Sequence, residues 1–238
     1  MVVSAAVMYN SWTLTLRVAF KEVNNAGLYF WMATDYFCDL IYTADILISM
    51  RTGYLEDGIL QTDGHKLRKH YFHTVSFVLD AFSVLPVDIL FLFISYDPAV
   101  RLNRLLKYYR FWHFLDRTEN RTTHPNLFRL ASLIQFILVI IHWNACIYFI
   151  VSRYIGFGTD NWVYPGVKGM TKLNNTYSTL ARKYVYSFYW STQTLTTIGE
   201  IPSPYTNLEY IIVTINYLTG ELHGVTFYIK LLLSIFLF

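Results

Sequence analysis

The stretch Tyr184–Pro204 reads YVYSFYWSTQTLTTIGEIPSP and decides how the rest of the chain is interpreted. An aromatic-rich run, which can form a short helix, leads into two hydroxyl residues, an apolar residue, a glycine and an acid. Because glycine permits close approach of the backbone, carbonyl groups of such a loop can line a narrow path with a carboxylate at one end. The loop residues are Thr196, Thr197, Ile198, Gly199 and Glu200.

The composition favours a membrane protein over a soluble one. Of the 238 residues, 54% are hydrophobic, 18% aromatic and only 15% charged, against about 25% charged residues in an average soluble chain. Aromatic side chains gather at membrane–water interfaces, so we expect contact with membrane lipid. The net charge of +3 is too small to indicate a nucleic-acid partner. Cys38 and Cys146 lie in apolar stretches and are expected to be buried thiols.

The hydrophobic segments predict an all-α membrane protein with six transmembrane helices. A spanning helix needs roughly 20 mainly apolar residues. The candidate segments are Val2–Phe20, Leu28–Met50, Thr74–Ile94, Pro98–Leu115, Asn126–Val151 and Leu208 to the C-terminus. Tyr184–Pro204, before the last segment, is predicted to be a re-entrant pore loop. Such a break in helical structure at membrane depth is tolerated only where the backbone is buried or lines a water-filled path.

The fourth segment carries a cation at every third residue, which makes it too charged to face lipid. The cations are Arg101, Arg104, Lys107 and Arg110, and His113 continues the spacing. On an α-helix this spacing gives a slowly winding stripe, whereas on a 3₁₀ helix the charges line up. An amphipathic surface helix with a solvated basic face is the alternative interpretation.

Acidic residues lie in two neighbouring apolar segments. The second segment contains Asp35, Asp39 and Asp45, and the third contains Asp80 and Asp88 on one helical face. Charges in membrane spans are costly, and they usually pair or mark function. Acids on two helices and cations on a third therefore predict a bundle of the voltage-sensor kind. Pairing alone is also compatible with a purely structural role.

These features predict a voltage-gated-like channel fold in two domains. Residues 1–115 are expected to form a voltage-sensor-like helix bundle and residues 116–125 a linker. Residues 126–238 are expected to form a pore domain of outer helix, pore loop and inner helix. One chain supplies one pore loop, so a closed pore needs several chains around an axis.

The position of the Thr196–Glu200 loop favours a cation selectivity filter over an ordinary turn after an aromatic core helix. A potassium filter continues with Tyr-Gly after its glycine, whereas here Glu200 follows Gly199. Fewer stacked carbonyl sites weaken discrimination between potassium and sodium, and a ring of carboxylates attracts divalent cations. We therefore expect weak discrimination between sodium and potassium, and calcium bound at Glu200. No cofactor is expected.

At these residues the chain resembles the transmembrane core of cyclic-nucleotide-gated cation channels. The resembling stretches are YNSWTLTLRVAF (Tyr9–Phe20), RTGYLEDG (Arg51–Gly58), VRLNRLLKYYRFWHFLDRTENRT (Val100–Thr122), IIHWNACIYF (Ile140–Phe149), GFGTDNWVYP (Gly156–Pro165) and YWSTQTLTTIGE (Tyr189–Glu200). The resemblance implies a homo- or heterotetramer with other channel subunits, in the plasma membrane, opened by cGMP or cAMP. It also implies an alpha-type, pore-forming subunit, because Glu200 matches the filter glutamate of that type.

The chain departs from the family pattern after Gly220. The family continues its last helix with an apolar run, whereas Glu221, Leu222, His223 and Gly224 follow here, so we expect an atypical, truncated last helix. The family's nucleotide-binding domain has no counterpart in these residues, and we expect no nucleotide-activated current from this chain alone. Two alternatives stay open, a non-conducting truncated subunit that modulates full-length partners and an incomplete gene model.

Two sequons test the expected topology. Asn174 lies in the loop before the filter and is the glycosylation candidate, whereas Asn120 follows a span that ends on the other side of the membrane. No motif supports an enzyme, since His142 lies in an apolar helix where a packed core histidine is expected.

Overall fold

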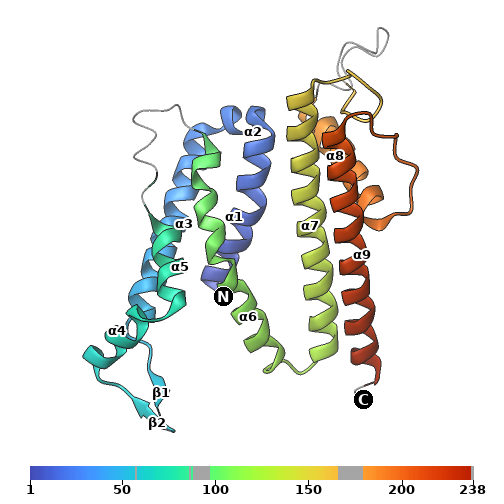
Figure 1. Cartoon of the computed structure of the whole chain (residues 1–238). Helices are drawn as coiled ribbons and strands as arrows, with labels where there is room; N and C mark the ends of the chain where they lie inside the picture. The colour runs from blue at the N-terminus through green and yellow to red at the C-terminus, as the bar shows by residue number, and fades with distance from the viewer. Residues whose placement is uncertain (57, 86, 88–96, 166–178, 237–238) are drawn as a thin grey trace. The chain divides into compact units, whose positions relative to one another are not determined.

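The computed structural model describes residues 1–56, 58–85, 87, 97–165 and 179–236, and most of these residues are helical (Figure 1). The chain divides into two compact units, Met1–Thr118 and Glu119–Phe238. The predominance of helix agrees with the expected all-α class. Asp88 and Asn174, two of the predicted site residues, lie outside the described residues.

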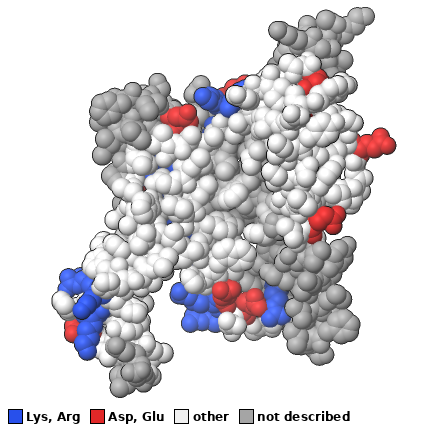
Figure 2. Space-filling view, in the orientation of Figure 1, with Lys and Arg blue, Asp and Glu red and all other residues white. Residues whose placement is uncertain are grey.

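The first unit is a bundle of helices with a small hairpin at one end (Figure 1). Its elements are α1 (Val2–Ala19), α2 (Lys21–Ala26), α3 (Leu28–Ser49), β1 (Tyr54–Glu56), β2 (Ile59–Gln61), α4 (Gly64–Phe72), α5 (Val75–Val84), the 3₁₀ helix η2 (Pro98–Tyr108) and α6 (Tyr109–Glu119). The antiparallel hairpin pairs Leu55 with Leu60. η2 packs against both α1 and α5. On the face shown in Figure 2, Lys and Arg gather over α4, and most of the surface over the other helices is white.

The start of η2 follows from two residues. The Asp97 carboxylate accepts a hydrogen bond from the Ala99 backbone N–H at 3.1 Å, and Pro98 occupies the first turn, where its missing N–H is not needed. The segment expected at Pro98–Leu115 is therefore two helices in sequence, a 3₁₀ helix and then α6. Because the first part is 3₁₀, the cations at every third residue lie in a line.

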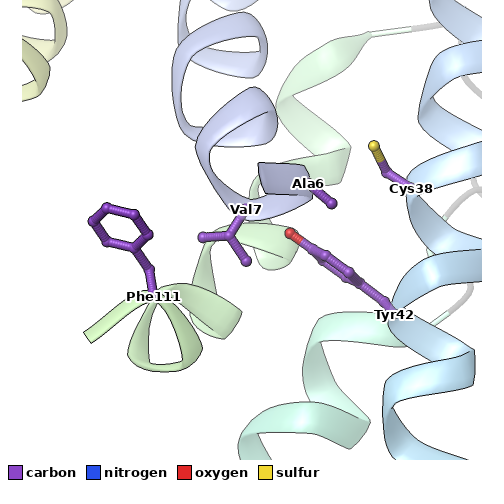
Figure 3. Close-up of a cluster of buried hydrophobic side chains, with 5 residues drawn as sticks. All are labelled: Ala6, Val7, Cys38, Tyr42 and Phe111. Carbon is purple, nitrogen blue, oxygen red and sulfur yellow. The ribbon is translucent and has the colours of Figure 1, made fainter. Parts of the chain in front are cut away.

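A small apolar cluster joins three helices of the first unit (Figure 3). Figure 3 shows Ala6 and Val7 of α1, Cys38 and Tyr42 of α3 and Phe111 of α6 gathered around the same volume. The Tyr42 hydroxyl accepts a hydrogen bond from Asn10 Nδ2 at 3.0 Å, so its polar end is satisfied although the residue is fully buried. The expected burial of Cys38 and Cys146 is confirmed.

The second unit contains α7 (Pro125–Ile155), α8 (Leu180–Thr196) and α9 (Asn207–Phe236). α8 packs against both α7 and α9. The Tyr148 ring of α7 stacks on the Trp190 ring of α8 at 4.0 Å, and Trp162 meets both rings edge-on. This aromatic cluster fixes α8 against α7.

Several boundaries differ from those expected. The expected linker, residues 116–125, is helical at both ends, because α6 continues to Glu119 and α7 begins at Pro125. Its non-helical part is therefore shorter than expected. α9 runs through Glu221 and Gly224 without a break. Within the described residues, α7 is the one helix long and apolar enough to cross a membrane by length and composition. Six spans stay a prediction.

Candidate functional site

The first unit brings its cations and acids together in a buried row of ion pairs, which we call the ladder. We call Arg101, Arg104, Lys107 and Arg110 the charge stripe. Arg101 contacts Asp39 closely and lies 3.5 Å from Asp35 Oδ2. Arg104 donates from Nε to Asp39 Oδ1 at 3.1 Å and from Nη2 to Asp39 Oδ2 at 3.2 Å. Asp39 therefore serves two arginines of the stripe.

The lower half of the ladder uses Asp45 and Asp80. Lys107 Nζ lies 3.0 Å from Asp45 and 3.3 Å from Asp80, and these contacts are ion pairs by distance. Its ammonium donates a hydrogen bond to the Tyr42 carbonyl at 3.1 Å. Arg110 pairs with Asp45 at 3.1 Å and Asp80 at 2.9 Å, and also donates to Ser49 Oγ at 2.6 Å.

Tyr71 of α4 closes this end of the ladder. Its hydroxyl donates to Asp80 Oδ2 at 2.6 Å. Burial raises the pKa of the Tyr71 phenol, and the hydrogen bond to Asp80 raises it further, so the phenol keeps its proton at neutral pH. α4 is thus fastened to the charged interior of the bundle.

The burial of the charge stripe distinguishes it from the basic face of a surface helix. Arg101, Arg104 and Lys107 are at most 3% exposed, so the stripe is not the solvated basic face of a surface helix. Unpaired charges at this depth would be costly, and pairing with carboxylates compensates that cost. The four cations of the charge stripe thus lie opposite three acids, Asp39, Asp45 and Asp80. Asp35 lies at the Arg101 end of this row.

Sequence reasoning missed Arg17 of α1. It is fully buried, and its Nη1 lies 3.0 and 2.9 Å from the two oxygens of Asp35. Arg17 occurs alone in an apolar helix, outside the every-third-residue spacing. A single cation in a predicted span is the signal that could have identified it.

The predicted filter begins at the last residue of α8 in the second unit. Thr196 is the last residue of α8, and Thr197 adopts a left-handed conformation with a φ of 55° that ends the helix. A helix C-terminus carries partial negative charge on its free carbonyl groups. α8 therefore directs negative potential toward the loop that begins at Thr197, which favours cations there.

The loop is exposed in the single chain. Ile198 is 88% exposed, and Thr196, Thr197 and Glu200 are also exposed. Gly199 sits against the Gln193 side chain so closely that a Cβ would lie 2.6 Å from Gln193 Nε2. In the described part of the chain no cluster of three or more His, Cys, Asp or Glu could hold a metal. Calcium takes six to eight oxygen ligands, more than the single Glu200 carboxylate can supply.

Buried hydrogen bonds hold α8 to α7 behind this loop. Asn144 Nδ2 donates to Ser191 Oγ at 3.0 Å, and Ser191 Oγ donates to the Ile141 carbonyl at 2.9 Å. His142 Nδ1 and the Tyr184 hydroxyl lie 2.9 Å apart. His142 is fully buried, which confirms the packed core histidine.

α9 contributes a cap and a close backbone contact. The buried Glu209 carboxylate accepts hydrogen bonds from the Tyr205 N–H at 2.7 Å and from the Thr206 hydroxyl at 2.8 Å. These bonds fix the residues that lead into the first turn of α9. Further along, a Cβ at Gly220 would lie 2.1 Å from the Leu195 carbonyl oxygen. Only glycine allows α9 to approach the last turn of α8 this closely. The close approach at Gly220 was not predicted from the sequence.

Comparisons with known proteins agree with this architecture. The family described as ion transport protein matches residues 1–238. The chain is 46% identical over 222 residues to the cyclic nucleotide-gated channel alpha-2 of Rattus norvegicus. The matched region covers 93% of this chain and 33% of that protein. It is 49% identical over 222 residues to the cone photoreceptor subunit alpha of Gallus gallus, covering 93% of this chain and 30% of that protein.

The same similarity extends to the alpha-3 subunit of Homo sapiens, 46% identical over 92% of this chain and 31% of that protein. The chain spans about a third of the length of these relatives. The matches confirm the resemblance inferred from the sequence motifs. The chain belongs to the ion transport protein family, and nearly all of it is similar to cyclic nucleotide-gated channel alpha subunits.

Proposed function

We propose that the chain is the transmembrane, pore-forming part of a tetrameric cation channel of the cyclic nucleotide-gated type. The observation that carries the proposal is the T-T-I-G-E loop at the C-terminal end of α8, in a chain that the ion transport family matches throughout. The exposure of this loop in one chain supports assembly, because carbonyl and carboxylate rings form only when several copies surround an axis.

In this proposal the chain crosses the plasma membrane six times. α1, α3, the segment that includes α5, η2 with α6, α7 and α9 are the spans, and α8 with the residues after it is the re-entrant pore loop. Residues 1–115 act as the voltage-sensor-like bundle, residues 116–125 as the linker and residues 126–238 as the pore domain. Buried ion pairs in the first unit support this assignment, because such charges are costly in a membrane unless paired.

Sodium, potassium and calcium are the proposed ions, with Thr196, Thr197, Ile198, Gly199 and Glu200 as the filter. The relatives' names describe gating by a cyclic nucleotide, and we propose that cGMP or cAMP opens this channel through segments other than these 238 residues. The reason is that the chain matches only about a third of each relative.

A chimera tests the function. Residues 1–238 replace the matching region of the rat alpha-2 subunit, and excised patches are perfused with cGMP. We expect a current carried by sodium and potassium but not by chloride. A chimera that forms tetramers at the cell surface and still carries no cation current contradicts the proposal.

A further inference from the structure

We propose that the outer side of α4 is a binding surface for anionic lipid headgroups at one boundary of the membrane. The residues that carry this binding are Lys66, Arg68 and Lys69, which we call the α4 cations. The inference rests on the proposed function in treating α3 and the segment that includes α5 as spans. It does not depend on whether the pore conducts, and its test separates these two claims.

The inner side of α4 is fixed to the helical bundle. Leu67 and Tyr71 lie one helical turn apart and are both buried. The Tyr71 hydroxyl donates to Asp80 of α5 at 2.6 Å. The Tyr54 ring of β1 stacks on the His70 ring with 3.9 Å between centroids. Since α4 is held by these contacts, its exposed α4 cations keep their place on the side away from the bundle.

The α4 cations take part in no ion pair among the described side chains. The sequence of α4, GHKLRKHYF, contains no acid. Asp63, just before it, is used as the helix cap and accepts a hydrogen bond from the His65 N–H at 3.1 Å. By contrast, each cation of the charge stripe has a carboxylate within 3.5 Å. Three exposed cations within two turns make a local positive potential that suits an anionic partner (Figure 2).

The surroundings of α4 are those of a helix at headgroup level. It lies between the end of α3 at Ser49 and the start of α5 at Val75, at one end of the first unit (Figure 1). Phe72, Val75 and Val78 are 45%, 73% and 47% exposed, so an apolar surface begins where the α4 cations end. Exposed Lys and Arg next to an exposed apolar surface are typical of helices that lie at the membrane interface.

An anionic lipid leaflet fits this surface better than an acidic protein does. The α4 helix is tied at both ends to proposed spans, which keeps it within about a helix diameter, roughly 10–12 Å, of the headgroups. The attraction between exposed charges extends over about 10 Å at 0.1 M salt. Each Lys or Arg near an anionic leaflet strengthens binding by about fivefold. The α4 cations are therefore within range of lipid charge whenever the bilayer contains it.

Hydrogen–deuterium exchange of the full 238-residue chain tests the proposal. The chain is reconstituted into nanodiscs of phosphatidylcholine alone, or of about three parts phosphatidylcholine to one part phosphatidylserine. Because a helix held by headgroups opens less often, the amides of α4 are expected to exchange about fivefold more slowly with phosphatidylserine. Adding about 0.5 M sodium chloride is expected to remove this difference, since salt screens exposed charges.

Matched substitutions locate the binding. Lys66→Gln combined with Lys69→Gln is expected to give the same exchange of α4 in both kinds of nanodisc. Lys21→Gln removes an exposed lysine of α2, at the other end of the first unit (Figure 1), and is expected to leave the slowing of α4 unchanged. The salt series needs no substitution and decides the matter if the double variant does not enter nanodiscs.

The outcomes that contradict the proposal are distinct from those that contradict the proposed function. Equal exchange of α4 in the two nanodiscs for the parent chain overturns the proposal and leaves the α4 cations to an acidic protein partner. Slowing that persists in the double variant also overturns it. Slow exchange of α3 and α5 without a lipid effect on α4 counts against this proposal alone. Fast exchange throughout α3 and α5 overturns the proposed spans, and this proposal with them.

Discussion

At the scale of single residues, the clearest contrast lies between a buried ion pair and an exposed one. Asp80 is fully buried, pairs with Lys107 and Arg110, and accepts the Tyr71 hydroxyl. Glu119 pairs with Arg129 at 2.6 Å, but the two side chains are 32% and 43% exposed. The same chemistry therefore occurs in the second unit where water screens it.

Asp80→Asn is expected to destabilise the chain by up to about 3–5 kcal/mol, since Lys107 and Arg110 keep Asp45 but lose the fully buried carboxylate that both also contact. The matched variant Glu119→Gln is expected to change stability by less than about 1 kcal/mol. Thermal unfolding of the detergent-solubilised chain measures both. Equal shifts in melting temperature for the two variants would show that the ladder contributes little to stability.

Most of the ladder was predictable from residue spacing, and Arg17 was not. Arg101, Arg104, Lys107 and Arg110 repeat every third residue, and repetition is visible without a structure. Arg17 has no such pattern, and its role depends on how α1 turns toward α3. The same limit applies to Asn144 and Ser191, whose buried hydrogen bond depends on the packing of α7 and α8.

At the scale of elements, Gly220 and Gly224 lie one helical turn apart on α9 but in different surroundings. A Cβ at Gly220 would overlap the Leu195 carbonyl oxygen at 2.1 Å, whereas a Cβ at Gly224 meets nothing within 4 Å in the described chain. The two positions share backbone conformation and differ only in what lies beside them. They therefore form a matched pair for testing how α9 seats against α8.

Gly220→Ala is expected to destabilise the chain by about 1–3 kcal/mol, because α9 must move away from a backbone atom that cannot yield. Gly224→Ala is expected to stabilise it by up to about 1 kcal/mol, since alanine favours helix. Melting temperatures of the two variants should move in opposite directions. A rise in melting temperature for Gly220→Ala would contradict the close packing of α9 on Leu195.

The apolar runs of the sequence located three long helices and, to within a few residues, their ends. α1, α3 and α7 begin and end within a few residues of the expected segments, because hydrophobic runs mark helices directly. The 3₁₀ form of η2 was left open, since the same spacing fits two helical geometries. The helices α2 and α4 and the β1–β2 hairpin arose in segments expected only as connections, where polar composition hides short elements.

At the scale of the whole molecule, the proposed six spans place the two sequons on opposite sides of the membrane. Asn174 is expected to carry a glycan and Asn120 is not, because of the two segments that carry sequons only the loop before the filter faces outward in this topology. Expression in mammalian cells followed by glycosidase digestion should shift the parent chain on a gel but not Asn174→Gln. A glycan on Asn120 would overturn the six-span arrangement.

Assembly was predictable only in outline. The sequence shows one pore loop per chain, which requires several copies, and the exposed Ile198 and Glu200 agree with that requirement. The number of copies rests on the similarity to cyclic nucleotide-gated channel alpha subunits.

The central claim, that Thr196–Glu200 forms a cation filter closed by a ring of Glu200 carboxylates, is tested most directly by calcium block. In the chimera with the rat alpha-2 subunit, sodium current is recorded with rising external calcium for the parent and for Glu200→Gln. Since the attraction of a carboxylate ring increases with ion charge, the account predicts strong block of the parent and at least tenfold weaker block of Glu200→Gln. Equal calcium block of both would remove Glu200 from the filter and contradict the account.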